Sequence, residues 1–240
     1  MLTNPPKRSI ILDRTYEIAL RYEPYKEGSM YSSEHLQALL AVLTDFPTER
    51  FDAIFLHVRS HGDDDQIFQV AQGLHALAGG VPFILFTGTD GQRLGGTKPF
   101  EAWPGKAVYT KKLEELGIVE VQHTKAAYHT RQENDSFLER AIQLNWKSAV
   151  ILNGGIQLLR SFLGQIKVMQ EQNYWMRIYA QCPRPYDLHK IVSPSQGGQP
   201  TRRMQQVETE MNNISKYQAR GDIASFSDLF DYMKRRQTIK

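Results

Sequence analysis

Short apolar runs alternate with longer amphipathic segments through the middle of the chain. A nearly continuous apolar run is typical of a strand that is buried on both faces of a parallel sheet. Glycine or polar turn residues follow most of these runs, so each strand is separated from the next helical segment. The predicted strands cover residues 53–58, 81–86, 119–122, 149–152 and 174–180.

The segments between the strands place apolar residues at helical spacing. We predict helices over 67–77, 106–116 and 133–144, and another that contains residues 156–163. Regular alternation of strand and helix with right-handed crossovers predicts an α/β fold, a Rossmann-like doubly wound, mostly parallel five-stranded sheet. No GxGxxG follows any of the strands, so the dinucleotide-binding fingerprint is absent.

Both ends of the chain differ from this middle region in composition and in the pattern of apolar residues. The first fifty residues predict two helices, over 10–22 and 34–43, and the region after Cys182 is rich in proline and glycine before two further helices. These terminal helices suggest an alternative use of the protein as a scaffold or homodimer. The predicted parts are an N-terminal helical extension (1–50), a Rossmann-like core (51–182), and a linker with C-terminal helices (183–240).

Charge and composition narrow the class of protein. Lys and Arg number 29 against 26 Asp and Glu, and much of the excess lies in the tail after residue 233, so no nucleic-acid-binding face is predicted. No uncharged run reaches the length of about 18 residues that a membrane span needs. A single cysteine, Cys182, fits a reducing compartment. We therefore expect a cytoplasmic protein with no membrane contact.

Polar residues gather where predicted strands end and predicted helices begin. In an open parallel sheet these positions meet at one edge, so residues far apart in the sequence can line one crevice. We predict a small-molecule site at this edge. Its candidate ligand-binding residues are Gly88, Asp90, Arg131, Glu133, Asn134, Asn153, Gly154 and Arg160.

Each candidate has a structural alternative. Glu133 and Asn134 suit ribose hydroxyls or an amino group of a ligand, but in the first turn of a helix they could equally serve as capping residues. Arg131 and Arg160 could hold a carboxylate or phosphate, or lie on the surface. The turn that begins at Asn153 could receive an anion at its backbone N–H groups, or be a plain turn.

A histidine pair near the first strand raises a metal hypothesis. His57 and His61 are followed by aspartates at 63–65. Histidines at i and i+4 on a strand that runs into a loop do not face one point, and no matched third ligand follows. We therefore predict no metal site and expect one of the aspartates to cap the next helix.

The polar cluster and the strand that follows it resemble the family of domain of unknown function 218, the YdcF-like and SanA-like proteins. Glu133-Asn134 matches the family's Glu-Asn pair, Arg160 its later arginine, and Thr87-Gly88-Thr89 its small-residue loop. The resemblance runs from about residue 51 to 221 and identifies the chain as a divergent member. It implies a Rossmann-like fold and, from the YdcF-like branch, binding of S-adenosylmethionine.

Several positions depart from the family pattern. Arg131 occupies the place of the family's threonine, and Gln157 replaces its histidine. The first strand leads into His57 and the residues after it where a Gly-Gly loop is usual. A glutamine can orient a ligand but does not titrate near neutral pH, so the substitution favours binding over acid–base catalysis.

Three functions follow from these observations. We expect binding of a nucleotide-derived small molecule, with S-adenosylmethionine as the first choice. One alternative is an enzyme acting on a phosphorylated or glycosyl substrate, with Glu133 as the best catalytic candidate; a helix N-terminus and neighbouring arginines keep such a carboxylate ionised, so it would act as a base. The other alternative is a non-catalytic scaffold.

Overall fold

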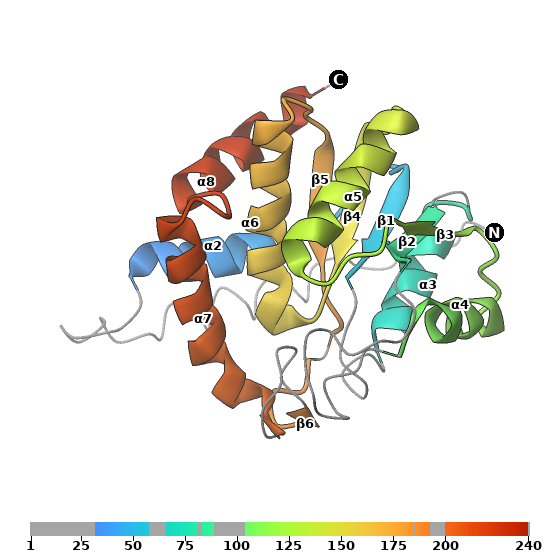
Figure 1. Ribbon diagram of the computed structural model, residues 1–240, viewed down its shortest axis with the longest axis horizontal. Helices are drawn as coiled ribbons and strands as arrows, with labels where there is room; N and C mark the ends of the chain where they lie inside the picture. Colours follow the sequence, from blue (N-terminus) through green and yellow to red (C-terminus); the bar gives the residue numbers. More distant parts are fainter. Residues whose placement is uncertain are drawn as a thin grey trace, which may run out of the picture. The chain divides into compact units, whose positions relative to one another are not determined.

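Six stretches of the chain are described by the computed structural model, and their elements belong to one compact unit, Ser33–Lys240 (Figure 1). The stretches are 32–57, 66–80, 83–88, 104–184, 186–192 and 200–239. The helix predicted over 10–22 lies outside the described residues.

Five strands form a single sheet in the order β3-β2-β1-β4-β5. Every neighbouring pair is parallel, which confirms the predicted Rossmann-like doubly wound fold; the sheet is wholly parallel where we expected it to be mostly so. The strands are β1 (Ala53–Leu56), β2 (Phe83–Thr87), β3 (Val121–Thr124), β4 (Ser148–Leu152) and β5 (Arg177–Gln181).

The two central strands, β1 and β4, are buried along their whole length. Ile54 pairs in register with Val150, and Phe55 with Ile151. Side chains on both faces of these strands are removed from water, which stabilises the fold by about 1.5–3 kcal/mol for each large apolar residue. This burial explains why their sequences are continuous apolar runs without alternation.

Helices cover the sheet in two pairs (Figure 1). The helices α3 (Ile67–Leu77) and α4 (Lys106–Glu115) contact each other, with α3 against β1 and α4 against β3. The helices α5 (Thr130–Gln143) and α6 (Gly155–Glu171) pack side by side, with α5 against β2 and β3 and α6 against β4 and β5. The strand order reverses between these pairs, so right-handed crossovers place them on opposite faces.

The remaining helices pack around α6. Helix α2 (Ser33–Leu43) contacts α6, α8 and β5, and α7 (Arg203–Ala219) runs along α6. Helix α8 (Phe226–Arg235) contacts α2 and α6 (Figure 1). A two-stranded antiparallel hairpin, β6 (Ile191–Val192) with β7 (Thr201–Arg202), lies in the region predicted as linker. Its strands are too short for a periodic pattern to reveal them.

Side chains cover the free edge of β5. Asp45 Oδ2 accepts the Ala180 N–H at 2.8 Å, and the Tyr232 hydroxyl accepts the Ile178 N–H at 2.6 Å. Arg236 donates to the Ile178 carbonyl at 2.7 Å. Uncovered strand edges tend to pair with other chains. These contacts give the backbone N–H and carbonyl groups on the edge of β5 hydrogen-bond partners, which protects the protein from aggregation through this edge.

Asp45 and Arg236 form a buried, two-pronged ion pair. Nη1 and Nη2 of Arg236 each lie 2.8 Å from one carboxylate oxygen of Asp45. Burial disfavours the charged guanidinium, but the hydrogen bonds and charge of Asp45 outweigh it and raise the pKa of Arg236. The pair links the end of α2 to the C-terminal helix across β5.

One helix start and one helix cap differ from the predictions. Helix α5 begins at Thr130, earlier than the predicted residue 133, because His129 Nδ1 accepts the Gln132 N–H at 3.4 Å and so caps the helix. The N-cap of α3 is Gln66, without a side-chain cap. The prediction that an aspartate of 63–65 caps this helix is therefore wrong, because the N-cap position falls on Gln66; the aspartates themselves lie outside the described residues.

Candidate functional site

A cavity of about 440 Å³ lies at the C-terminal ends of β1 and β4. The strand order reverses here, and such crevices are where open α/β sheets bind their ligands. The cavity is within the size range of small-molecule sites. Its walls are His57, Ala127, Tyr128, His129, Thr130, Arg131, Glu133, Asn134, Asn153, Gln157, Arg160, Gly164, Tyr217, Arg220, Asp222 and Ile223.

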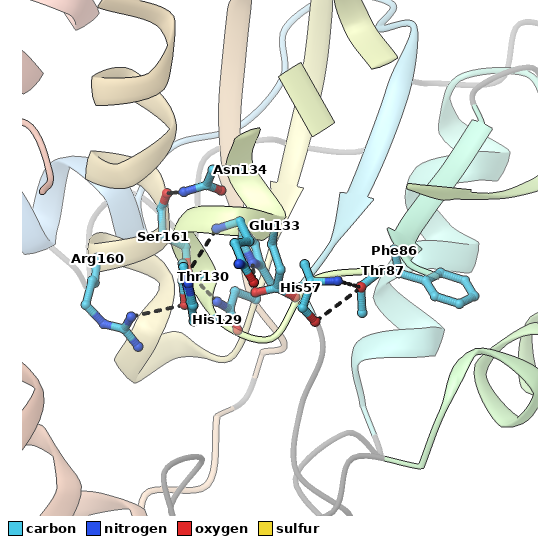
Figure 2. Close-up of polar contacts among 12 residues, drawn as sticks. His57, Phe86, Thr87, His129, Thr130, Glu133, Asn134, Arg160 and Ser161 are labelled. Atoms are coloured by element: carbon cyan, nitrogen blue, oxygen red, sulfur yellow. Dashed lines mark hydrogen bonds and ion pairs between the residues drawn. The ribbon is translucent and has the colours of Figure 1, made fainter. Parts of the chain in front are cut away.

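His57 is the first residue after β1, and its N–H donates to the Leu152 carbonyl at 3.0 Å. The residue is 1% exposed, and Nδ1 lies 3.1 Å from Oε2 of Glu133 (Figure 2). Among the described residues, none is a hydrogen-bond partner for its Nε2. Within the described residues, His57 therefore presents one bonded and one unpartnered nitrogen at the point where the strand order reverses.

Glu133 lies in the first turn of α5 and is 5% exposed. Its own N–H donates to the His129 carbonyl at 3.1 Å, which begins the helix. The positive end of the helix dipole favours a carboxylate at this position. Since Oε2 faces His57, the structure gives Glu133 a histidine partner that the sequence pattern did not indicate.

Asn134 is fully buried between α5 and α6. Its side-chain amide donates to the Ser161 carbonyl at 3.3 Å, as Figure 2 shows. A Cβ atom on Gly164 would lie only 2.5 Å from Nδ2 of Asn134. A glycine at 164 thus lets the two helices approach, and Asn134 joins them at the cavity wall.

This contact makes a specific prediction for Gly164→Ala. The methyl group would displace the Asn134 amide, and overpacking costs about 1–3 kcal/mol, against a gain of about 1 kcal/mol in helix propensity. We expect a net loss of stability in urea unfolding. In the Asn134→Ala background the space is free, so the same substitution should stabilise. Equal effects in both backgrounds would contradict the assigned contact.

Asn153 follows β4, and its side chain shapes the turn into α6. Oδ1 accepts the Gly154 N–H at 2.7 Å, and the amide donates to the Ser161 hydroxyl at 2.6 Å. Gly154 is the N-cap residue of α6 and has no side chain with which to cap the helix. The Gln157 N–H donates to the Gly154 carbonyl at 3.0 Å, and neither Gly155 nor Ile156 lines the cavity, so α6 contributes to the cavity through side chains.

Arg160 is held by two neighbouring helices. Its Nε forms a buried ion pair with Glu210 of α7, and Nη1 donates to the Thr130 hydroxyl at 3.1 Å (Figure 2). The ring of Tyr217 lies 6.0 Å from the guanidinium. Nη2 has no hydrogen-bond partner in the described part of the chain. One nitrogen of Arg160 is therefore available to a ligand.

Arg131 lines the cavity but binds carboxylates of the protein. Nη2 contacts Glu171 of α6, and Nε lies 3.1 Å from Asp135. Burial disfavours the charged form, but the hydrogen bonds to these two carboxylates outweigh it and raise the pKa of Arg131. The same contact lowers the pKa of Glu171. Arg131 therefore ties α5 to α6, and Arg160 is the better partner for an anion.

The two residues predicted from the loop after β2 take no described part in the cavity. Gly88 is absent from its walls, and a Cβ there would lie 2.6 Å from the Thr124 carbonyl, so glycine lets β2 approach β3. Asp90 lies outside the described residues. Gly154 shapes the α6 start without lining the cavity.

Sequence reasoning missed two parts of this site. It weighed His57 only as a metal ligand, although a histidine directly after a central buried strand is itself a signal for the crevice. It also treated the C-terminal helices as an extension, whereas Tyr217 of α7 and three residues of the α7–α8 turn, at 220, 222 and 223, line the cavity. Local patterns contain no signal for that contact.

Comparison with models of known protein families finds none that matches the chain, and no curated protein matches its sequence. The resemblance to the family of domain of unknown function 218 therefore stays a prediction. The fold and the site geometry described above rest on the chain itself.

Two features of other protein classes are absent from the described residues. No helix in the described ranges is long and apolar enough to cross a membrane. The described residues contain no group of three or more His, Cys, Asp or Glu side chains arranged to hold a metal ion. His61, one half of the histidine pair, lies outside the described residues.

Proposed function

We propose that the protein binds a small, nucleotide-derived molecule in the cavity at the ends of β1 and β4. Three polar groups there have no hydrogen-bond partner within the described ranges: Nε2 of His57, the side-chain amide of Gln157, and Nη2 of Arg160. Polar groups in a largely buried wall are normally satisfied, so a ligand or water is expected to pair with them. Their convergence is the observation that supports binding.

The chemistry of these groups suits a ligand that carries an anionic group together with hydroxyl or amino groups. The guanidinium nitrogen of Arg160 favours a carboxylate or phosphate. The Gln157 amide both donates and accepts, which suits ribose or base edges. S-adenosylmethionine, with its carboxylate, ribose and adenine, is the first ligand to test, in keeping with the YdcF-like resemblance; nucleoside monophosphates are the second.

The variant Gln157→Ala tests the binding function. Gln157 is in the first turn of α6 and is 8% exposed, and loss of its hydrogen bonds should weaken binding about tenfold. Isothermal titration calorimetry with S-adenosylmethionine, S-adenosylhomocysteine and thymidine 5′-monophosphate measures the affinity. Wild-type protein that gives no heat with any of the three compounds would remove the proposed function.

A matched control lies at the other end of the same helix. Gln172, the exposed C-cap residue of α6, is far along the helix from the cavity. Gln172→Ala should bind each compound as the wild type does. If Gln157→Ala binds as tightly as Gln172→Ala, the ligand occupies another part of the molecule.

We also infer that this binding takes place in the cytoplasm. Cys182, the single cysteine, follows β5 and is 5% exposed. Burial raises the pKa of its thiol and keeps it protonated, which makes it unreactive. A free, buried thiol suits a reducing compartment.

A further inference from the structure

The His57–Glu133 pair determines which nitrogen of the imidazole carries a proton. An ionised carboxylate only accepts hydrogen bonds, so the 3.1 Å contact with Oε2 assigns the proton to Nδ1. In the neutral imidazole, Nε2 then holds a lone pair. That atom is buried and unpartnered in the described part of the protein, in a residue that lines the cavity. A carboxylate that orients an imidazole in this way is the arrangement of a general base.

We infer that His57 is the general base of a hydrolytic site for phosphate esters, with Glu133 as the residue that positions it. This inference rests on the proposed binding of a nucleotide-derived anion in the same cavity. His57 and Asn153 directly follow the paired strands β1 and β4, whose last residues, Leu56 and Leu152, are in register. Neighbouring strands are about 4.8 Å apart, so His57 lies near Asn153, two residues before α6 begins.

The cavity also provides an anion-binding group. Nη2 of Arg160, a residue that lines the cavity, can hold a phosphate oxygen. A phosphate ester bound there would place its phosphorus near a water molecule on Nε2 of His57. Gln157, in the same helical turn, can orient the alcohol part of the ester.

The reaction is hydrolysis by one activated water molecule. Nε2 takes a proton from the water as the water oxygen bonds to phosphorus. The bond from phosphorus to the ester oxygen breaks, and the leaving oxygen takes the electron pair and then the proton from the imidazolium. The Glu133 carboxylate stabilises that imidazolium at Nδ1. Because its Oε2 is engaged there, Glu133 positions the base and does not attack water itself.

The probe for this reaction is p-nitrophenyl thymidine 5′-monophosphate, which releases p-nitrophenol, coloured in its ionised form, and thymidine 5′-monophosphate. The wild-type full-length chain should hydrolyse it, and His57→Gln should lower kcat/KM about 100-fold or more. The matched control is His123→Gln. His123 is exposed on β3, near the same edge of the sheet but outside the cavity, so its replacement should leave the rate unchanged.

Two further variants separate catalysis from folding. His57→Ala removes the ring, and free imidazole added to it should restore at least about a tenfold gain in rate, which a damaged fold would not show. Glu133→Ala should lower kcat about tenfold or more while KM changes little, because it disturbs the base and leaves the anion site intact. Circular dichroism of each variant is recorded first, and His57→Asn replaces His57→Gln if the latter does not fold.

The outcomes distinguish this inference from the binding function. A wild type that hydrolyses the ester no faster than buffer, or a His57→Gln rate within twofold of the wild type, overturns the assignment of His57 as a base. Calorimetry with thymidine 5′-monophosphate is run on the same preparations. Heat of binding without turnover leaves the binding function in place, whereas absence of both turnover and heat with all three compounds removes both proposals.

Discussion

Replacing Glu210 with alanine is expected to destabilise the protein by about 3–5 kcal/mol and to weaken ligand binding. Arg160 and Glu210 form an ion pair that is almost fully buried between α6 and α7. Removal of the carboxylate leaves a buried guanidinium without its counter-charge, and it also frees Arg160 to leave the cavity wall. Urea unfolding measures the first effect, and calorimetry with S-adenosylmethionine or thymidine 5′-monophosphate measures the second.

Two comparisons make this test specific. Glu208→Ala removes an exposed carboxylate from the same helix and should change neither stability nor binding. The double variant Arg160→Met with Glu210→Leu should recover much of the stability, because apolar residues can replace a buried ion pair, but binding should stay weak. If Glu210→Ala behaves like Glu208→Ala, the ion pair does not hold α7 against α6.

The second large effect is expected for Asp45→Ala, with a loss of about 3–5 kcal/mol. This change leaves Arg236 buried without its counter-charge and the Ala180 N–H on the edge of β5 without an acceptor. Urea unfolding monitored by circular dichroism measures the loss. Light scattering should also show increased association, because the edge of β5 is less well covered.

Asp45→Asn separates the two contributions at this position. The asparagine carbonyl can still accept the Ala180 N–H, but it does not neutralise Arg236. We expect its stability to lie between those of the wild type and Asp45→Ala. Identical stability of all three proteins would show that the contacts among Asp45, Ala180 and Arg236 do not stabilise the edge of β5.

The strands were predictable because both faces of the sheet are covered. β1 and β4 lie at its centre, so nearly every residue in them must be apolar, and this composition is visible in one short window of sequence. The helices between strands showed apolar stripes for the same reason. The hairpin β6–β7 and the earlier start of α5 depend on short-range hydrogen bonds, such as the one from the Gln132 N–H to His129, which leave no periodic pattern.

The location of the candidate site was predictable from the sequence, but the roles of its residues were predictable only in part. Strand ends and helix starts meet at one edge of any open parallel sheet, so Glu133, Asn153 and Arg160 were expected at the crevice, and they line the cavity. Their partners come from distant segments. Glu133 contacts His57, which is 76 positions away, and Arg160 contacts Glu210, 50 positions away.

Local composition and spacing alone thus define the α/β class, the alternation of strands and helices, and the edge at which a ligand is expected, since these depend on burial within short segments. The strand order that places β1 beside β4, the pairing of His57 with Glu133, and the closing of the cavity by the α7–α8 turn were decided by the tertiary structure. Each of these features depends on contacts between residues far apart in the chain. A local sequence pattern does not specify which of many chemically compatible residues a side chain contacts.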